Sequence, residues 1–284
     1  MFRKDTELYH LFWQSWKTWP DPPGVVWGHA VSKDYAKWER LPDVLSPGSF
    51  SGGATQLPNG GVKLLYKDTA KGNKFFTASP SNLSDPNLVK WAEARQASGV
   101  VGSTDPSPGW AIDPENPTRG FYAAVGSLST QTATKGGGAV DLWQADADFA
   151  HFKSLGRQLF SFPWDRKNGQ GGPGDKYQSA VPRDPNFWRA QAGTANEPEI
   201  WAFEGAMKMC FFAGHDFYVL GKYNDTAVSF TPHDELRTMG SDPFDFGGSM
   251  FASQTFEGAP HPNNPGPDPN LGVGLLLKAQ TEPC

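Results

Sequence analysis

A short unit that recurs along the chain constrains the fold more than any other feature of the sequence. Its first clear form, residues 27–55, has an aromatic and β-branched run, a polar turn at residues 32–34, the closing aromatic Trp38 and the pair Gly52-Gly53. Apolar runs broken by short polar turns are typical of strands, because Ser and Asp side chains can bond their own backbone. The unit therefore predicts a strand, a turn and the entrance to a second strand.

The same theme returns at residues 75–91, 140–152 and 217–230, and in part at residues 250–256. The closing aromatics lie roughly 50 to 80 residues apart, which suits one four-stranded unit with loop insertions. Four units and a partial fifth predict an all-β fold, a five-bladed β-propeller whose first and fifth blades can be incomplete. We expect it to be a single domain over residues 1–284, with an all-β sandwich as the alternative that the pattern leaves open.

Composition supports strands and excludes several classes of partner. The 32 Gly and 25 Pro residues disfavour long helices. The net charge is −5 with dispersed Lys and Arg, so no basic stripe predicts a nucleic-acid partner. No window approaches the roughly 18 uninterrupted apolar residues of a spanning helix, so we expect no membrane partner.

The cysteines and histidines show no metal-ligand spacing. Cys210 and Cys284 lie far apart, and His10 and His29 fall within predicted strands, where hydrogen-bonded structural histidines are expected. We therefore predict neither a metal nor a cofactor. The first residues carry charges where a signal peptide has its apolar core; localisation and oligomeric state are left open.

Acids beside aromatic or proline residues are the candidates for chemistry. Asp105 stands in a Gly-Ser-Thr-Asp-Pro run ahead of Trp110, Asp184 in a Pro-Arg-Asp-Pro run, and Glu204 in a group of acids around Trp201. Carboxylates transfer protons or act as nucleophiles, and aromatic faces cover the apolar side of a sugar ring. The pattern indicates a carbohydrate site, while each acid taken singly also fits a turn-capping or solvated role.

Three motifs in order, residues 9–14 (YHLFWQ), residues 27–34 (WGHAVSKD) with Trp38, and residues 50–54 (FSGGA), resemble glycoside hydrolase family 32. That family contains invertases, inulinases and fructosyltransferases, and the resemblance extends more faintly to residues 251–256. It implies a five-bladed propeller with a funnel-shaped site at one end of its axis. It also implies a retaining mechanism in which one Asp attacks the fructosyl unit, a Glu protonates the leaving oxygen and a second Asp holds sugar hydroxyls.

The resemblance assigns the catalytic residues only in part. Asp105 matches the fructose-binding Asp of the family's Arg-Asp-Pro motif, with Thr104 in place of the Arg. The acid/base is Glu204 in one register, whereas in the other register its place is taken by Arg183, which cannot donate a proton near neutral pH. The nucleophile motif is expected just before the strand that begins at Leu8, and the chain begins after it.

The resemblance further implies substrate contacts at Gln14, Trp27 and Ser51, with Phe50 as a wall of the pocket. We therefore expect a small-carbohydrate partner, sucrose or a fructo-oligosaccharide, and hydrolysis of β-fructofuranosyl linkages. The alternative is a non-catalytic propeller that binds fructosyl sugars, or a degenerate one. The β-sandwich module usual in the family is not expected after residue 284.

Overall fold

The computed structural model describes residues 1–16, 24–99, 106–113, 116–128, 138–162, 183–191, 200–207, 215–232, 254–257 and 273–276. In these ranges the strands form five separate antiparallel sheets, four of four strands and one of two. The all-β prediction is confirmed.

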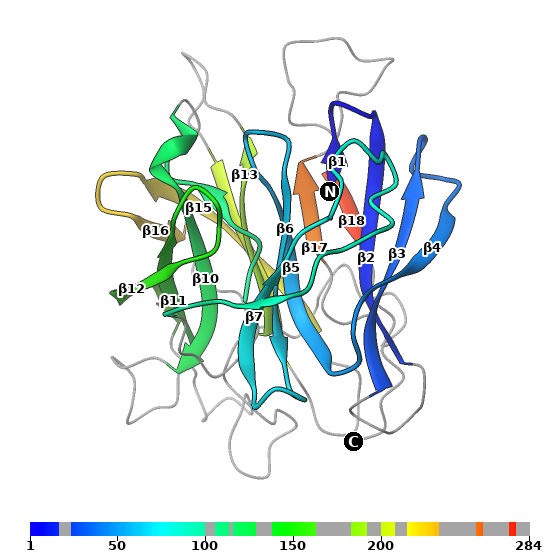
Figure 1. The fold of residues 1–284 in the computed structure, drawn as a ribbon. Coiled ribbons are helices and arrows are strands. Elements are labelled where there is room, and N and C mark those ends of the chain that lie inside the picture. The colour runs from blue at the N-terminus through cyan, green and yellow to red at the C-terminus, as the bar shows by residue number, and fades with distance from the viewer. Residues whose placement is uncertain are drawn as a thin grey trace.

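Each four-stranded sheet is built from strands that follow one another along the chain (Figure 1). The first sheet contains β1 (Phe2–Arg3), β2 (Leu8–Trp16), β3 (Val25–Ser32) and β4 (Glu39–Leu45). The second contains β5 (Ser49–Gln56), β6 (Val62–Asp68), β7 (Lys74–Ala78) and β8 (Arg95–Gln96). The third contains β9 (Trp110–Ala111), β10 (Phe121–Leu128), β11 (Gly138–Ala145) and β12 (Phe152–Phe162), with the 3-10 turn Pro117–Arg119 before β10.

The fourth sheet contains β13 (Arg183–Gln191), β14 (Ile200–Met207), β15 (His215–Asn224) and β16 (Ser229–Pro232), and the fifth contains β17 (Gln254–Glu257) and β18 (Val273–Leu276). Contacts between sheets follow chain order: β2 and β3 contact β5, β10 contacts β13, and β13 contacts β17. Strand β13 also contacts β5. Sequential meanders that touch in this order are the arrangement expected of units placed around a common axis.

One turn geometry repeats between the third and fourth strands of all four large sheets. A side-chain oxygen at the start of each turn accepts hydrogen bonds from backbone N–H groups two to five residues further on; the accepting residues are Asp34, Asp85, Asp146 and Asn224. These bonds satisfy backbone donors that the strands cannot pair. The repeat in the sequence therefore corresponds to one capped turn.

Each of these turns also holds a non-glycine residue at positive φ: Tyr35 (61°), Leu88 (48°), Phe149 (52°) and Val228 (48°). Bulky residues pay a steric cost in this region. Leu88 and Phe149 are fully buried, and Val228 is 5% exposed, so burial of the side chain offsets the strain. The indole N–H groups of Trp38 and Trp91 close two of the turns by donating to the Tyr35 and Leu88 carbonyls.

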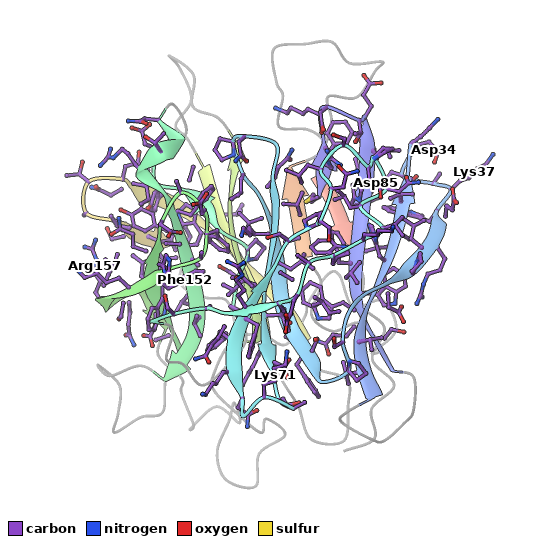
Figure 2. The ribbon with its side chains drawn as sticks, in the orientation of Figure 1. Asp34, Lys37, Lys71, Asp85, Phe152 and Arg157 are labelled. Carbon is purple, nitrogen blue, oxygen red and sulfur yellow. The ribbon has the colours of Figure 1, made fainter. Side chains whose placement is uncertain are left out.

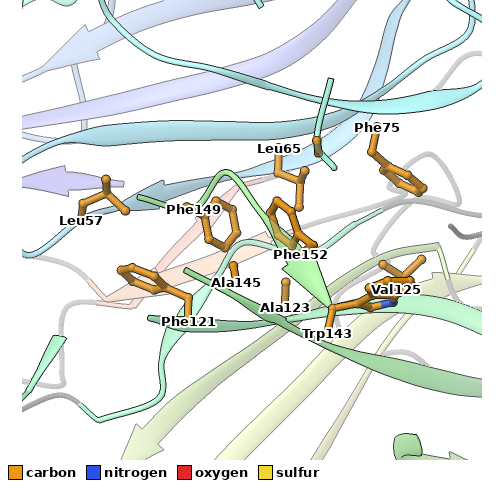
Figure 3. Close-up of a cluster of buried hydrophobic side chains, with 11 residues drawn as sticks. Leu57, Leu65, Phe75, Phe121, Ala123, Val125, Trp143, Ala145, Phe149 and Phe152 are labelled. Atoms are coloured by element: carbon orange, nitrogen blue, oxygen red, sulfur yellow. The ribbon is translucent and has the colours of Figure 1, made fainter. Parts of the chain in front are cut away.

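The second sheet is packed on both faces. Leu64 and Tyr66 of β6 pack with Trp27 of the first sheet, whereas Leu65, which points to the other face, joins a cluster with the third sheet. That second cluster, shown in Figure 3, contains Leu57, Leu65, Phe75, Ala97, Phe121, Ala123, Val125, Trp143, Ala145, Phe149 and Phe152. The second sheet therefore separates two apolar clusters, one on each of its faces.

Buried Arg3 links the first sheet to the second, and a buried histidine pair links two strands within the first sheet. Arg3, 1% exposed, donates to the carbonyl oxygens of Leu83 (2.9 Å) and Asp85 (3.1 Å). His10 and His29 lie on β2 and β3 with Nδ1 and Nε2 3.0 Å apart. The two histidines are hydrogen-bonded structural residues, as the sequence predicted.

Candidate functional site

Four residues predicted to contact sugar lie together at one end of the first and second sheets. Gln14, near the end of β2, pairs across the sheet with Trp27, near the start of β3. Phe50 and Ser51 lie at the start of β5. The Gln14 amide Nε2 donates to Ser51 Oγ (2.6 Å), and the Trp27 indole Nε1 donates to the Phe50 carbonyl (2.8 Å). Two separate sheets thus supply one polar cluster.

The end of the molecule that carries this cluster can be followed in Figure 2. Ser49 pairs with Asp68, the last residue of β6, and Lys71 follows in the next turn. Lys71 lies at the lower end of the molecule in Figure 2, whereas Asp34 and Asp85 lie towards the upper end. The cluster is therefore at the opposite end from the capped turns at Asp34 and Asp85.

A β-bulge presents Phe50 and Ser51. Ser49 pairs with Asp68 and Gly52 with Tyr66, so three steps along β5 face two steps along β6. The extra residue takes Phe50 and Ser51 out of the regular ladder, and bulges of this kind re-aim side chains next to functional sites. The hydrogen bonds from Gln14 and Trp27 then hold the bulge on the first sheet.

Trp27 is buried beneath the bulge and supports it. Its ring is 4% exposed, lies 6.0 Å from the Tyr66 ring, and uses its only polar atom on the Phe50 carbonyl. Gln14, Phe50 and Ser51 are partly exposed. A sugar at this end would therefore meet these three side chains first.

A second polar group, which sequence reasoning did not single out, lies beside the cluster. Asp68 is 1% exposed; its Oδ1 accepts from the Lys71 backbone N–H (3.0 Å), and its Oδ2 lies 3.7 Å from Lys71 Nζ. Burial raises the pKa of neighbouring Tyr66 to about 12, so its phenol is neutral at physiological pH. The only sequence signal was an acidic residue at a strand end, which more often caps a turn, and here it does cap one.

Of the two predicted catalytic acids, the structure describes only the backbone of Glu204. Asp105 lies outside the described residues; Pro106, which follows it, pairs with Val125 of β10. The Glu204 backbone lies on β14, paired with Asn186 and Tyr218.

Arg183, which takes the place of the acid/base in the other register, opens β13. This strand is at the edge of the fourth sheet and contacts β5, whereas β14 is one strand further in. Both registers thus put the acid/base position on the fourth sheet, and the choice between them stays a prediction.

No group of three or more His, Cys, Asp or Glu side chains in the described ranges is arranged to hold a metal ion. Within the same ranges, no helix has the length and apolar character needed to cross a membrane.

Comparison with known proteins defines the family. The model of the glycosyl hydrolases family 32 N-terminal domain matches residues 2–162, more than half of the chain. The chain therefore belongs to glycoside hydrolase family 32, as its motifs suggested.

Two similar curated proteins are plant enzymes. It is 28% identical over 276 residues to a fructan 6-exohydrolase of Triticum aestivum, an alignment that covers 88% of this chain and 44% of the relative. It is 29% identical over 267 residues to an acid β-fructofuranosidase of Phaseolus vulgaris, covering 87% of this chain and 38% of the relative. The chain thus spans less than half the length of these curated relatives.

Solved structures match the fold over nearly the whole chain. Fructan 1-exohydrolase IIa from Cichorium intybus aligns with a TM-score of 0.63 and 23% identity over 90% of this chain and 47% of that chain. A fructofuranosidase from Schwanniomyces occidentalis, complexed with fructose, aligns with a TM-score of 0.65 and 16% identity over 98% of this chain and 50% of that chain. At this identity the likeness shows the fold, which is all-β and propeller-like.

Proposed function

We propose that this chain forms the sugar-binding propeller of a hydrolase that acts on β-fructofuranosyl linkages in sucrose or fructan by a retaining mechanism. The observation that carries the proposal is the convergence of the three family motifs on one cluster, through the Gln14–Ser51 and Trp27–Phe50 hydrogen bonds. The five sheets, four of four strands and one of two, support a five-bladed propeller over residues 1–284 with an incomplete fifth blade. The names of the relatives support the substrate class: one structural match is a fructan 1-exohydrolase in complex with 1-kestose.

The cluster has the chemistry that a sugar requires. The Gln14 amide and the Ser51 hydroxyl offer both donors and acceptors for sugar hydroxyls, and Phe50 offers an aromatic face for the apolar side of the ring. Their mutual hydrogen bond and the bulge hold them in one geometry before a sugar arrives. Such preorganisation reduces the entropy lost on binding.

In the proposed mechanism, Asp105 holds fructosyl hydroxyls while positive charge develops on the ring, and Glu204 protonates the leaving oxygen. A retaining reaction also needs a carboxylate nucleophile about 5 Å from the acid. No residue of this chain is assigned to that role, so binding without turnover is the second candidate function.

Calorimetric titration with fructose and sucrose tests binding. We expect the wild type to bind and Ser51→Ala to bind about tenfold more weakly, the loss of roughly one good hydrogen bond. Ser98→Ala is the matched control, because Ser98 is an exposed serine bonded to His151 between the second and third sheets. A silent titration of folded wild-type protein would contradict the proposal.

Release of fructose from sucrose and inulin separates the two candidate functions. Turnover that Glu204→Gln abolishes supports the hydrolase, whereas turnover that survives this substitution removes Glu204 from the mechanism. Binding without turnover supports the sugar-binding propeller. Asp105→Asn should weaken fructose binding in either case, because the carboxylate is assigned to the sugar hydroxyls.

A further inference from the structure

The chain just after Asp105 contains a second bulge, in the third sheet. Pro106 pairs with Val125 and Trp110 with Tyr122, so four steps on one side face three on the other. Ser107 fills the irregular position: its N–H donates to the Ala124 carbonyl (2.8 Å), and its Oγ accepts from the Ala124 N–H (2.8 Å). Ser107 is fully buried, so its hydroxyl replaces a backbone acceptor where water cannot.

This second bulge reaches across to β5. The Gly109 N–H donates to Thr55 Oγ1 (2.7 Å), and Thr55 is only 2% exposed. A Cβ on Gly53 would lie 2.3 Å from the Pro108 backbone nitrogen, and one on Gly109 would lie 2.4 Å from the Phe149 ring. The two segments therefore touch backbone to backbone, at a distance that larger residues would not allow.

Strand β5 connects the two bulges, and its contacts with Pro108 and Gly109 are called the lock below. Its early residues, Phe50 and Ser51, are held by the first sheet, and its later residues, Gly53 and Thr55, are held by the bulge of the third sheet. The Thr55 hydroxyl accepts the hydrogen bond across the second contact, and Ser107 holds the shape of the bulge that reaches it. A shift of the bulge by one residue would break both contacts and leave buried N–H groups unpaired.

We propose that Thr55 and Ser107 are positioning residues of the sugar site. They set the register between the β5 bulge, which carries Phe50 and Ser51, and the chain at Pro106, which directly follows Asp105. The inference rests on the proposed function, because it is the sugar that would contact both sides of this register. Small displacements of binding groups weaken recognition strongly. Thr55 and Ser107 would therefore raise the affinity for sugar by holding these groups in place, without contacting the sugar themselves.

Thr55→Val tests the lock, because valine keeps the shape and removes the acceptor of the Gly109 N–H. Fructose affinity, measured by calorimetry, should fall about tenfold or more, and Thr55→Ser, which keeps the hydroxyl, should restore it to within about threefold. Thr77→Val is the matched control: Thr77 is also buried, 6% exposed, and lies on β7 of the same sheet. It should bind fructose as the wild type does, even where it lowers the melting temperature equally.

Hydrogen exchange gives a second readout that needs no sugar. In Thr55→Val the Gly109 amide should exchange about tenfold faster or more, relative to amides of β11. Ser107→Ala should behave in the same way if Thr55→Val does not fold. Wild-type affinity in Thr55→Val, failure of Thr55→Ser to restore binding, or unchanged Gly109 exchange would each overturn the inference.

The outcome for the wild type keeps the two proposals apart. A silent wild-type titration removes the proposed function and the positioning role with it, while faster Gly109 exchange in Thr55→Val would still establish the lock between the sheets. Normal wild-type binding that Thr55→Val leaves unchanged removes the positioning role alone.

Discussion

At the level of the single residue, the buried pair His10 and His29 makes the stability of the fold depend on pH. Burial lowers the pKa of His10 to about 3 and that of His29 to about 4, from an ordinary value of 6.5, and mutual repulsion adds to the shift of His10. The unfolded chain therefore binds more protons than the folded one from about pH 6.5 down to about pH 4 for His29 and about pH 3 for His10. Stability is fully present above that window and falls as the pH falls through it.

We expect the free energy of unfolding to fall by up to about 1.4 kcal/mol per pH unit for each histidine that titrates. Urea unfolding between pH 7 and pH 4.5 measures this slope. His29→Gln should have a shallower slope, because it removes one titrating group. Equal slopes in the two proteins would show that the pair does not control acid stability.

At the level of the element, the capped turn joins a local sequence pattern to a tertiary contact. In the second sheet, Asp85 Oδ1 accepts from the Asn87 N–H (3.0 Å) and Oδ2 from the Val89 N–H (2.9 Å). The same segment brings its carbonyl groups to buried Arg3. The turn thus caps its own strands and anchors the second sheet to the first.

Asp85→Ala should lower the free energy of unfolding by about 1 to 2 kcal/mol, since two backbone N–H groups lose their acceptor. Asp34→Ala is the matched variant in the first sheet. It should cost less than Asp85→Ala does, because Asp34 is exposed and water can replace its oxygen. Equal losses in urea unfolding would mean that burial of the turn does not set its contribution.

At the level of the whole molecule, stability depends on side chains that lie between sheets. Phe149 is fully buried and packs on Phe121 (5.6 Å between ring centres) and Phe152 (5.0 Å), as Figure 3 shows. Its ring also faces Gly109 of the bulge. It therefore belongs both to a capped turn and to the apolar cluster between the second and third sheets, and it also packs against the bulge at Gly109.

Phe149→Ala should lower the free energy of unfolding by about 3 to 5 kcal/mol, the usual cost of a large cavity in a core. Phe152→Leu, which keeps most of the volume, should cost less than about 1.5 kcal/mol. Circular dichroism and tryptophan fluorescence should report one shared transition, because the second and third sheets share this core. Two separate transitions would show that the sheets unfold independently.

The sequence by itself determined the features that depend on local chemistry. Alternating apolar runs, Asp or Asn at turn starts and closing aromatics act over a few residues, so they predicted the all-β fold, the repeated turn and the family motifs. The resemblance to glycoside hydrolase family 32, carried by motifs in the same sequence, assigned Gln14, Trp27, Phe50 and Ser51 to one proposed site.

Only the tertiary structure decided how those residues are used. The Gln14–Ser51, Trp27–Phe50 and Thr55–Gly109 hydrogen bonds join residues 37, 23 and 54 positions apart. Trp27 became a support for the β5 bulge, and the bulge of the third sheet came into contact with β5 at Gly53 and Pro108. The physical reason is that packing between sheets determines where a bulge forms and which strand it contacts. A local sequence pattern carries no information about contacts between residues so far apart in the chain.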